Sequence, residues 1–396
     1  MASDTTCPMP RVTAEPPKAQ EPEPKTRATT EAAPAPVAPL PSAAAEPEVV
    51  PVAPLPAPAQ AEEPTPQPVG TQVLLKVKAS GVCHSDLHIW DGYYELGGGK
   101  RLQLLDRGIK LPLTLGHENV GEIVAAGPDA KGVTIGDTVL VNPWIGCGTC
   151  AACQRGEDNL CRTPRNLGVF SNGGYADYLV VPHPRHLFGI GALTPEQAAP
   201  LACSGLTAYG ALKKVASVMA DNPIVIMGAG GVGLMGLLLV KAMGGKGAVV
   251  VDIDPNKRQA ALDAGALAAI DARAPDAAQQ IIAATNGGAA AVVDFVGAGD
   301  TVKLAIDALV PKAGKIVVVG FFGGELTIPT PYFPMRAMTI QGSYVGSHPE
   351  LRELLDLVGR TGALSFPVKT RPLDEANDAL MALKAGKVVG RVVLTP

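Results

Sequence analysis

The sequence predicts an α/β protein in which an irregular β-barrel-like domain is joined to a doubly wound parallel sheet, behind a disordered tail rich in proline and alanine. Three observations predict this fold: a sharp change of composition near Thr71, a series of short strand-like runs after it, and a later alternation of apolar strands with helices. A chain of 396 residues with 47% hydrophobic content can build two cores. We place the tail at 1–69, the barrel-like domain at 70–200, the doubly wound sheet at 201–344, and a return to the first domain at 345–396.

The tail is predicted from its proline content. Residues 1–70 hold 18 of the chain's 37 prolines, in repeated Ala-Pro and Glu-Pro steps. Proline lacks a backbone donor and biases the residue before it away from helix, so we expect no helix or strand here. Residues from about 61 to 70 are expected along the edge of the barrel-like domain. A fusion, an engineered extension and a mistranslated upstream stretch all stay open as origins of the tail.

The barrel-like domain is predicted from short apolar runs that are separated by Gly and Asp turns. Many short strands at this spacing are typical of a small barrel or sandwich. The runs are 73–79, 121–127, 137–141 and 174–181.

The doubly wound sheet is predicted from strands that alternate with helices, a pattern that favours parallel strands. We expect strands at 224–227, 248–251, 291–295 and 315–319, and helices at 231–243 and 256–264. The chain then returns to the first domain through a helix at about 350–359 and a terminal strand at 387–394.

Four cysteines within fifteen residues predict a metal loop: Cys147, Cys150, Cys153 and Cys161. Thiolates at this spacing can surround one tetrahedral zinc at about 2.3 Å each and leave no position open, which is typical of a structural site. The alternative is a loop of unpaired or disulfide-bonded cysteines.

A second set of possible ligands is spread along the chain. Cys83, His117 and Cys203 supply two thiolates and one imidazole, which is a ligand set of catalytic zinc sites whose fourth position is open to water or a substrate oxygen. Each of the three taken alone is more typical of packing than of a ligand.

A glycine-rich turn follows the strand at 224–227 and predicts a dinucleotide site. Its glycines permit a tight turn and close approach of a pyrophosphate to a helix N-terminus. Asp252 ends the next strand nineteen residues after Gly233, where a carboxylate would hold the ribose hydroxyls and favour NAD. Lys257 and Arg258 lie close by in sequence and leave NADP open. The candidate cofactor residues of this region are Gly228, Gly230, Gly231, Val232, Gly233, Asp252 and Lys257.

Taken in this order, the motifs resemble those of the zinc-dependent medium-chain alcohol dehydrogenases from about Thr71 to Pro396. The resemblance implies a GroES-like catalytic domain, a Rossmann domain, and two zinc ions per chain, one catalytic and one structural. It makes Cys83, His117 and Cys203 the catalytic ligands and the four clustered cysteines the structural ones. It further implies catalytic roles for Ser85, His88, Glu118 and Asp86, and cofactor contacts for Thr207, His84 and Arg391.

The sequence departs from the family pattern at two places. The family's opening strand pair is replaced by the tail, which we expect to leave a sheet edge unpaired. Residues 93–108 lengthen the connection between His88 and His117, either as a lining of the substrate pocket or as a plain surface loop. Trp90, Leu113, Phe321 and Phe322 are further candidates for an apolar pocket.

The resemblance implies reversible oxidation of an alcohol to an aldehyde or ketone with NAD. Two other functions stay open: a zinc-free quinone or enone reductase on the same fold, and a non-catalytic NAD-binding or zinc-loop interaction protein. The first would not need Cys83, His117 and Cys203 together, and the second would express without turnover.

Net charge and hydropathy limit the classes of partner that this protein can bind. A net charge of −4 and a pI of about 5.9 argue against nucleic acid and anionic membranes as partners. The sequence holds no long apolar run and no leader-like start, so we expect a cytoplasmic protein with reduced cysteines. The partner is a small alcohol, aldehyde or ketone, and the resemblance implies a homo-oligomer, either dimer or tetramer.

Overall fold

The structure is a computed structural model that describes residues 60–362 and 366–396. Most of the predicted tail, residues 1–59, lies outside the described residues. Residues 60–69 are exposed for the most part and have neither helix nor strand. Gly70 accepts a hydrogen bond from Asp129 N at 2.9 Å, so the start of the described chain lies against the turn after β4 (Glu118–Ala126).

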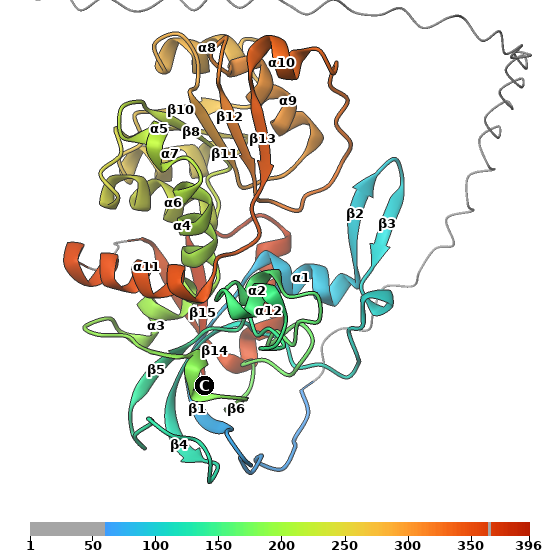
Figure 1. Ribbon diagram of the computed structural model, residues 1–396, viewed down its shortest axis with the longest axis vertical. Coiled ribbons are helices and arrows are strands. Elements are labelled where there is room, and N and C mark those ends of the chain that lie inside the picture. The colour runs from blue at the N-terminus through green and yellow to red at the C-terminus, as the bar shows by residue number, and fades with distance from the viewer. Residues whose placement is uncertain (1–59, 363–365) are drawn as a thin grey trace, which may run out of the picture. The chain divides into compact units, whose positions relative to one another are not determined.

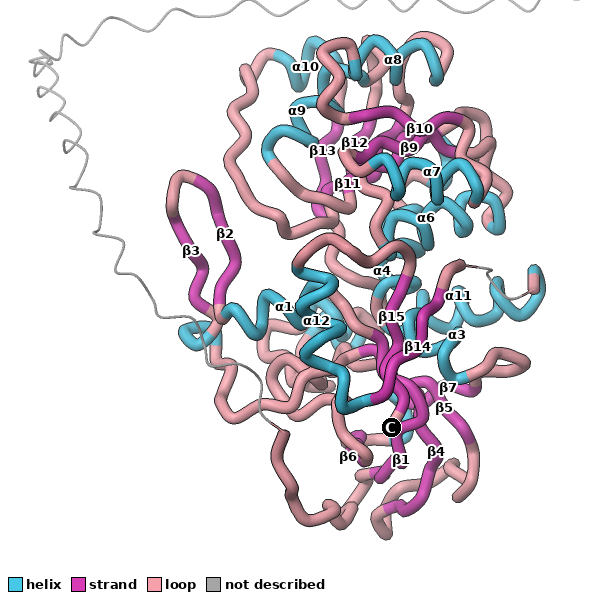
Figure 2. Tube along the Cα trace, turned by 180° about the vertical axis from the view of Figure 1, so that it is seen from behind, coloured by secondary structure: helices cyan, strands magenta, loops and turns pink. Residues whose placement is uncertain are grey.

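The first domain is built on a seven-stranded sheet in the order β14-β15-β1-β4-β5-β7, with β6 also paired to β1 (Figures 1 and 2). β1 is long and almost completely buried because both of its sides have partners: β4 on one side, and β6 and β15 on the other. The unpaired edge that we expected is therefore not at β1. The strands are β1 (Val73–Gly81), β4, β5 (Thr138–Val141), β6 (Tyr178–Val181), β7 (Leu187–Gly189), β14 (Val368–Pro372) and β15 (Arg391–Thr395).

The second domain is a parallel sheet in the order β10-β9-β8-β11-β12-β13, which confirms the predicted doubly wound fold. Its strands carry apolar side chains on both faces, so alternate residues enter two separate cores. Ile224 and Ile226 pack with α4, α6 and α11, whereas Val225 and Met227 pack with α8 and α9. The strands are β8 (Ile224–Met227), β9 (Ala248–Asp252), β10 (Ala268–Asp271), β11 (Ala291–Asp294), β12 (Lys315–Val318) and β13 (Thr339–Gly342).

The helices cover the sheet faces and join the domains. In both views α4 and α11 lie between the two sheets (Figures 1 and 2). A capping box of Ser347 and Glu350 starts α11. The helices are α1 (His84–Asp91), α2 (Ala151–Gln154), α3 (Pro195–Ala198), α4 (Ser204–Lys213), α5 (Ala216–Met219), α6 (Gly231–Ala242), α7 (Pro255–Asp263), α8 (Ala277–Ala284), α9 (Gly299–Ala308), α10 (Tyr332–Arg336), α11 (His348–Thr361) and α12 (Ala376–Lys384).

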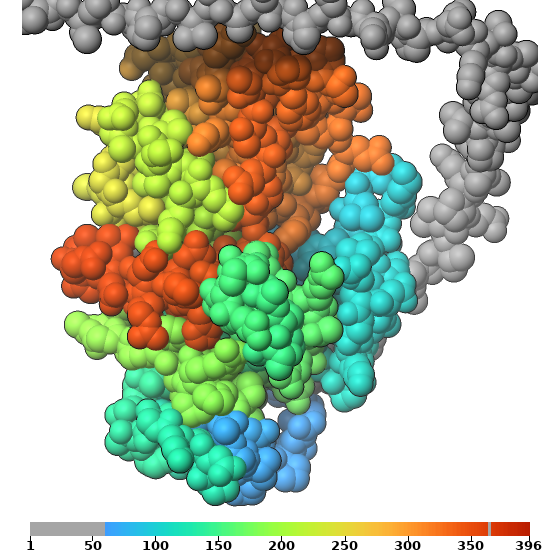
Figure 3. Space-filling view, in the orientation of Figure 1, coloured from blue at the N-terminus to red at the C-terminus, as the bar shows by residue number. Residues whose placement is uncertain are grey.

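The segment at 93–108 contains a β-hairpin, where the sequence suggested either a pocket lining or a loop. β2 (Tyr93–Gly97) pairs with β3 (Lys100–Gln103), and the connecting Gly98 and Gly99 both have positive φ, 58° and 76°. Two such residues match the twist of an antiparallel pair, which explains the run of glycines. The hairpin reaches the second domain, since a Cβ on Gly97 would lie 2.7 Å from Gly324 C (Figure 3).

Two strand predictions were wrong in extent. The terminal strand begins at Arg391 and not at 387, because Gly390 has a φ of 78° and interrupts the extended backbone before it. The strand expected at 174–181 begins only at Tyr178. Six strands were not predicted: β2, β3, β7, β10, β13 and β14. No helix in the described ranges is long and apolar enough to cross a membrane.

Candidate active site

Four buried side chains meet where three segments of the first domain converge. Their donor atoms all lie within 4.8 Å of one another, and we call them the inner cluster: Cys83, His117, Glu118 and Cys203. Cys83 follows β1 and caps α1, His117 and Glu118 stand at the start of β4, and Cys203 precedes α4. Residues 120 positions apart are thus brought together by the pairing of β1 with β4 and the packing of β4 against the segment before α4.

A buried carboxylate sets the orientation of His117. Asp86 Oδ1 lies 2.9 Å from His117 Nδ1, and its Oδ2 accepts hydrogen bonds from Cys83 N and the Tyr175 hydroxyl, both at 2.9 Å. A carboxylate oxygen accepts hydrogen bonds, so His117 donates its Nδ1 proton to Asp86. Nε2 is buried and has no hydrogen-bond partner in the described structure. An imidazole fixed in this way by a carboxylate is typical of a metal ligand, and the donor set fits zinc.

Glu118 connects the inner cluster with the second domain. Its carboxylate accepts a hydrogen bond from Ser204 N at 3.1 Å and forms a buried ion pair with Arg391. Arg391 in turn lies against the glycine-rich turn, because a Cβ on Gly231 would be 2.5 Å from Arg391 Cδ. Its Nε is buried without a partner among the residues described. Arg391 therefore lies between the cluster and the start of α6.

The electrostatics of the inner cluster reflect burial and close charges. Burial disfavours a charged His117, but the Asp86 carboxylate and the Cys83 thiolate outweigh it and hold the pKa of His117 well above its ordinary value. Burial raises the pKa of Glu118 to about 7, although Arg391 acts in the opposite direction. The pKa of the Cys83 thiol is lowered, first by its hydrogen bond with Cys203.

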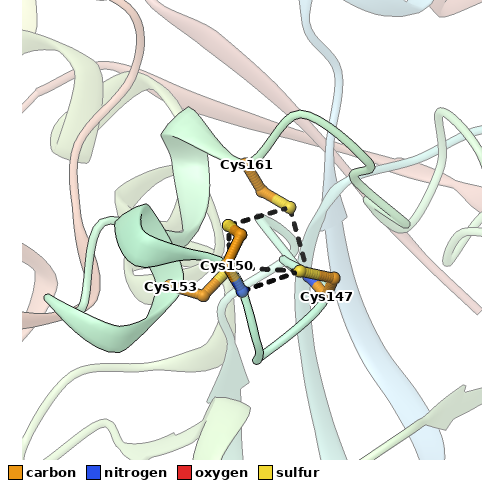
Figure 4. Close-up of side chains that lie close together, drawn as sticks. All are labelled: Cys147, Cys150, Cys153 and Cys161. Carbon is orange, nitrogen blue, oxygen red and sulfur yellow. Dashed lines mark hydrogen bonds between the residues drawn. The ribbon is translucent and has the colours of Figure 1, made fainter.

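The outer cluster, Cys147, Cys150, Cys153 and Cys161, lies on one irregular loop with α2 (Figure 4). Sulfur separations are 3.5 Å for Cys150–Cys153, 3.9 Å for Cys150–Cys161 and 4.0 Å for Cys147–Cys153. Ligands at about 2.3 Å from a tetrahedral centre would lie roughly 3.8 Å apart, so the spacing fits one zinc. Disulfides are not formed, because the cysteines described are all free.

Backbone N–H groups surround the outer cluster and favour thiolates. Cys147 N donates to Cys161 Sγ at 3.2 Å, and Cys150 N donates to Cys147 Sγ at 3.3 Å. Hydrogen bonds from Thr149 and Cys150 lower the pKa of Cys147 to about 5, whereas burial raises that of Cys153 to about 12. The hydrogen bonds to Cys147 therefore favour its thiolate, which is the form of cysteine that binds a metal.

The glycine-rich turn is closed by the residue that was predicted to hold ribose. Asp252 Oδ2 accepts a hydrogen bond from Ala229 N at 2.7 Å, and Oδ1 accepts one from Asp254 N at 2.8 Å. A carboxylate has about four acceptor positions, so capacity for a diol remains. Gly233 packs directly on Gly228 O, where any side chain would collide with the turn. The turn leads into the N-terminus of α6, a ready site for phosphate.

The other predicted residues lie around these groups. Ser85 and His88 lie three positions apart on α1, and His84 precedes them at its first turn. Burial lowers the pKa of His84 and of His88, and the charges on Arg391 and Lys257 act in the same direction on His84. Thr207 lies one turn into α4, and its N–H bonds to Cys203 O at 2.7 Å. Val232 follows Gly231 in the first turn of α6.

Sequence reasoning missed several aromatic residues beside the inner cluster. The Trp144 ring lies 5.7 Å from that of His117, and Tyr94 of the hairpin lies 4.8 Å from His88. Tyr175 holds Asp86, as described above, and Tyr344 contacts Trp144. Of the expected apolar pocket, Phe321 joins this group, whereas Phe322 is 72% exposed. Gly98 and Gly99 could have predicted the β-hairpin, and with it the placement of Tyr94 on a strand.

A barrel that carries two groups of soft ligands, joined to a sheet with a glycine-rich turn, defines the class of two-domain metal-binding dehydrogenases. Comparison with known families agrees with this class. Residues 70–191 match the alcohol dehydrogenase GroES-like domain, and residues 231–360 match the zinc-binding dehydrogenase domain.

Individual relatives give the same result. An NAD-dependent alcohol dehydrogenase of Sulfurisphaera tokodaii is 40% identical over 332 residues, which cover 83% of this chain and 94% of that protein. A D-arabinose 1-dehydrogenase (NADP(+)) of Saccharolobus solfataricus is 33% identical over 83% of this chain and 92% of its own length. The crystal structure of the alcohol dehydrogenase from Aeropyrum pernix superposes with a TM-score of 0.76 at 33% identity, covering 85% of this chain and 96% of that one. The chain belongs to the zinc-dependent medium-chain alcohol dehydrogenase family.

Proposed function

We propose that this protein oxidises an alcohol to an aldehyde or ketone, reversibly, with NAD as hydride acceptor and two zinc ions per chain. The observation that carries the proposal is the buried, unpartnered Nε2 of His117, which Asp86 aims at two free thiols. A polar atom buried without a partner is costly, so this arrangement favours a bound cation. The similarity to NAD-dependent alcohol dehydrogenases supports the reaction and the cofactor.

The inner cluster is assigned to substrate activation. Cys83, His117 and Cys203 would hold a zinc ion, which would supply Lewis-acid chemistry at this site. Ser85 and His88 lie on one face of α1, as residues three apart do, so the proton of the substrate hydroxyl can leave through the Ser85 hydroxyl to the His88 ring. Asp86 keeps His117 in one tautomer throughout.

The cofactor is assigned to the second domain. The turn from Gly228 to Gly233 and the start of α6 receive the pyrophosphate, with Arg391 supplying positive charge beside Gly231. Asp252 receives the ribose hydroxyls and favours NAD over NADP. His84, Lys257, Thr207 and Val232 complete the proposed cofactor contacts.

The outer cluster is assigned a structural role. Four thiolates fill a tetrahedral zinc and leave no position for a substrate. Asn159 of this loop donates to Tyr344 O at 2.9 Å and His348 N donates to Gly156 O at 3.3 Å, so the loop is attached to the segment that leads into α11. Loss of this metal is expected to weaken that attachment.

Self-association and a cytoplasmic location belong to the same proposal. β13 is the outermost strand of its sheet, and Phe322, Met335 and Phe333 near it are 72%, 63% and 39% exposed. An unpaired edge beside exposed apolar residues favours a dimer or tetramer. Free thiolates persist in a reducing compartment, which favours the cytoplasm. Sedimentation analysis of the purified chain tests the first point, and a monomer at micromolar concentration would contradict it.

The reaction is tested by measuring NAD reduction with primary, secondary and aromatic alcohols, with zinc determined per chain on the same sample. We expect turnover with NAD and two zinc ions. Turnover of quinones or enones by zinc-free protein would favour the zinc-free reductase. Two zinc ions and tight NAD binding without turnover of any alcohol, aldehyde or ketone would favour a non-catalytic binding protein.

A further inference from the structure

A continuous row of aromatic rings lies beside the inner cluster. Centroid separations along it are 5.7 Å for His117–Trp144, 6.0 Å for Trp144–Tyr344, 6.4 Å for Tyr344–Phe321, 5.3 Å for Phe321–Tyr94 and 4.8 Å for Tyr94–His88. Each distance is within the range of favourable aromatic contact, and each pair is tilted or edge-on. We call these six side chains the aromatic arc.

Both ends of the arc lie close to the inner cluster. His117 belongs to that cluster, and His88 lies on α1, the helix that Cys83 caps. The arc therefore starts and ends close to the residues that are proposed to hold the zinc ion and the substrate oxygen. The carbon substituent of a bound alcohol must extend from that oxygen, and the arc borders the space around it.

The arc changes from buried to exposed along its length. His117 is fully buried and Trp144 is 4% exposed, whereas Tyr344 and Phe321 are 42% and 46% exposed. Aromatic rings this exposed, gathered in one row, are unusual unless a ligand covers them. The exposed part lies where the two domains meet, since Tyr94 comes from the first domain and Phe321 follows β12 of the second.

The rings are held by contacts outside the arc. Trp144 Nε1 donates to Ala202 O at 3.0 Å, one residue before Cys203. The Tyr344 backbone is fixed by Asn159, and the hairpin fixes Tyr94. Positions fixed before a ligand arrives reduce the entropy that binding must overcome.

The polar groups of the arc are few. The indole N–H of Trp144 is already bonded to Ala202 O, which leaves the hydroxyls of Tyr94 and Tyr344 without hydrogen-bond partners in the described residues. A polyhydroxylated substrate needs a partner for each hydroxyl that it loses to water, and an unpaired one is costly. An aryl ring needs only apolar area and tilted ring contacts.

We propose that the site selects alcohols and aldehydes that carry an aryl ring, with Tyr94 as a residue that determines this specificity. The inference rests on the proposed function of the same site. Tyr94 is the critical member because it lies in the hairpin and contacts both His88 and Phe321. Substrates of the same size with a saturated ring, and polyols, are expected to be poorer.

The hairpin offers a matched control. Successive residues of a strand point to opposite faces, so Tyr93 is directed away from the arc, and its ring lies 4.0 Å from the Arg101 guanidinium carbon. Tyr93→Leu removes an aromatic ring from the same strand without touching the arc. Tyr94→Phe removes only the hydroxyl of Tyr94, and Tyr94→Leu removes the ring.

The experiment compares benzyl alcohol with cyclohexylmethanol, and D-arabinose serves as the polyhydroxylated substrate. The zinc-loaded full chain is used, with NAD. Ratios of kcat/KM are measured for the unmodified protein and for Tyr94→Leu, Tyr94→Phe and Tyr93→Leu. Binding of phenylacetamide and cyclohexylacetamide to the complex with NADH is measured by calorimetry, which gives a readout independent of turnover.

We expect the unmodified protein to prefer benzyl alcohol over cyclohexylmethanol by about tenfold, the upper range for favourable ring contacts. Tyr94→Leu should lower this ratio to near one and weaken phenylacetamide but not cyclohexylacetamide. Tyr94→Phe and Tyr93→Leu should keep the ratio. If thermal unfolding shows that Tyr94→Leu does not fold, Tyr94→Ile and the unmodified protein's own ratio decide the matter.

Equal kcat/KM for the two ring alcohols, or a preference for D-arabinose, would overturn the inference while the proposed dehydrogenase function stands. A ratio that falls equally in Tyr93→Leu and Tyr94→Leu would overturn the role of Tyr94. Absence of NAD reduction with all alcohols by protein that holds two zinc ions would overturn the proposed function and the inference with it.

Discussion

The two cysteine clusters differ in how the chain assembles them. The outer cluster takes all its sulfur atoms from one loop of fifteen residues, and Cys147 and Cys150 are partly exposed. The inner cluster takes its donors from three segments that span 83–203, and each of them is buried. A site made from one loop needs little of the surrounding fold, whereas the inner site exists only once β1, β4 and the start of α4 have packed together.

The difference teaches how function and stability are separated in one chain. The inner cluster contains Glu118 and contacts Asp86 and Arg391, and all three of these side chains are buried. Burial makes these interactions strong and makes each unpaired group costly. The outer cluster has mainly backbone N–H donors around it, which orient a loop and offer nothing to a substrate.

The largest effect is expected on kcat when a ligand of the inner cluster is changed. If kcat does not fall, the contrast between the two clusters is wrong. Cys203→Ser should lower kcat by about 10²- to 10³-fold, since the Lewis acid stabilises developing charge by several kcal/mol. Cys150→Ser should instead lower the unfolding temperature and leave kcat of the folded fraction within a few-fold of its normal value. Both variants should lose close to one zinc per chain, as measured by atomic absorption.

Equal losses of kcat and of thermal stability in the two variants would contradict the division of roles. Circular dichroism of Cys203→Ser controls for the fold. Cys150→Ser assayed at a temperature well below its transition controls for inactivation.

The second prediction tests whether the buried carboxylate of Asp86 contributes to zinc affinity and to kcat/KM. Asp86→Asn keeps the shape but removes the charge that orients His117, so zinc affinity or kcat/KM should fall by about 10- to 100-fold. Asp91→Asn is the matched control, because Asp91 lies at the other end of α1 in an exposed ion pair with Lys384 at 2.7 Å. Exposed pairs contribute little, so this variant should be nearly silent. Chelator competition measures the zinc affinity, and comparable effects in both variants would refute the role of Asp86.

A third variant removes a cofactor contact and should leave both clusters intact. Asp252→Ala should raise the Kd for NAD by about tenfold, the equivalent of one charge-assisted hydrogen bond, and affect NADP less. Zinc content should stay at the value of the unmodified protein. The variant also loses the bond to Ala229 N, so the turn itself is expected to loosen. A preference of the unmodified protein for NADP would show that the ribose assignment is wrong.

The effect that is smallest at neutral pH is on stability, and it concerns how the loop of the outer cluster is attached. His186 Nε2 accepts from Arg185 Nε at 3.2 Å, so its Nδ1 donates to His348 Nε2 at 3.1 Å, and Arg185 also bonds Asp158 of the outer loop at 2.5 Å. Burial, together with the nearby Arg185, lowers the pKa of His186 to about 2. Burial likewise lowers that of His348 to about 4, against the attraction of Asp158.

Since both folded pKa values lie below the ordinary value of about 6.5, the unfolded chain binds protons first. The contribution of the pair is complete above about pH 6.5 and is lost as the pH falls toward the folded pKa values, at up to about 1.4 kcal/mol per pH unit for each histidine. Urea unfolding between pH 7 and 4.5 measures this slope. His348→Gln keeps a hydrogen-bonding side chain and should flatten the curve, and an unchanged slope would contradict the assignment.

Local patterns of the sequence predicted much of this molecule, and long-range contacts account for what they missed. The strand Ile224–Met227 was predicted to the residue because a short apolar run ends in a glycine turn. The outer cluster was predicted because its spacing is self-contained. Trp144 and Tyr344 carry no local signal, since their significance comes from packing between segments some 200 residues apart. β10 and β13 were missed because the first is only partly buried and the second, at the sheet edge, is mostly exposed.

The ion pair between Glu118 and Arg391 has a thermodynamic consequence. Glu118 belongs to the inner cluster, and Arg391 packs under Gly231 at the dinucleotide turn, so one salt bridge is shared by the metal region and the cofactor region. Any shift of Arg391 toward a bound phosphate changes the charge that Glu118 feels, and the reverse also holds. Coupling of this kind is reciprocal: the factor by which dinucleotide alters zinc affinity must equal the factor by which zinc alters dinucleotide affinity.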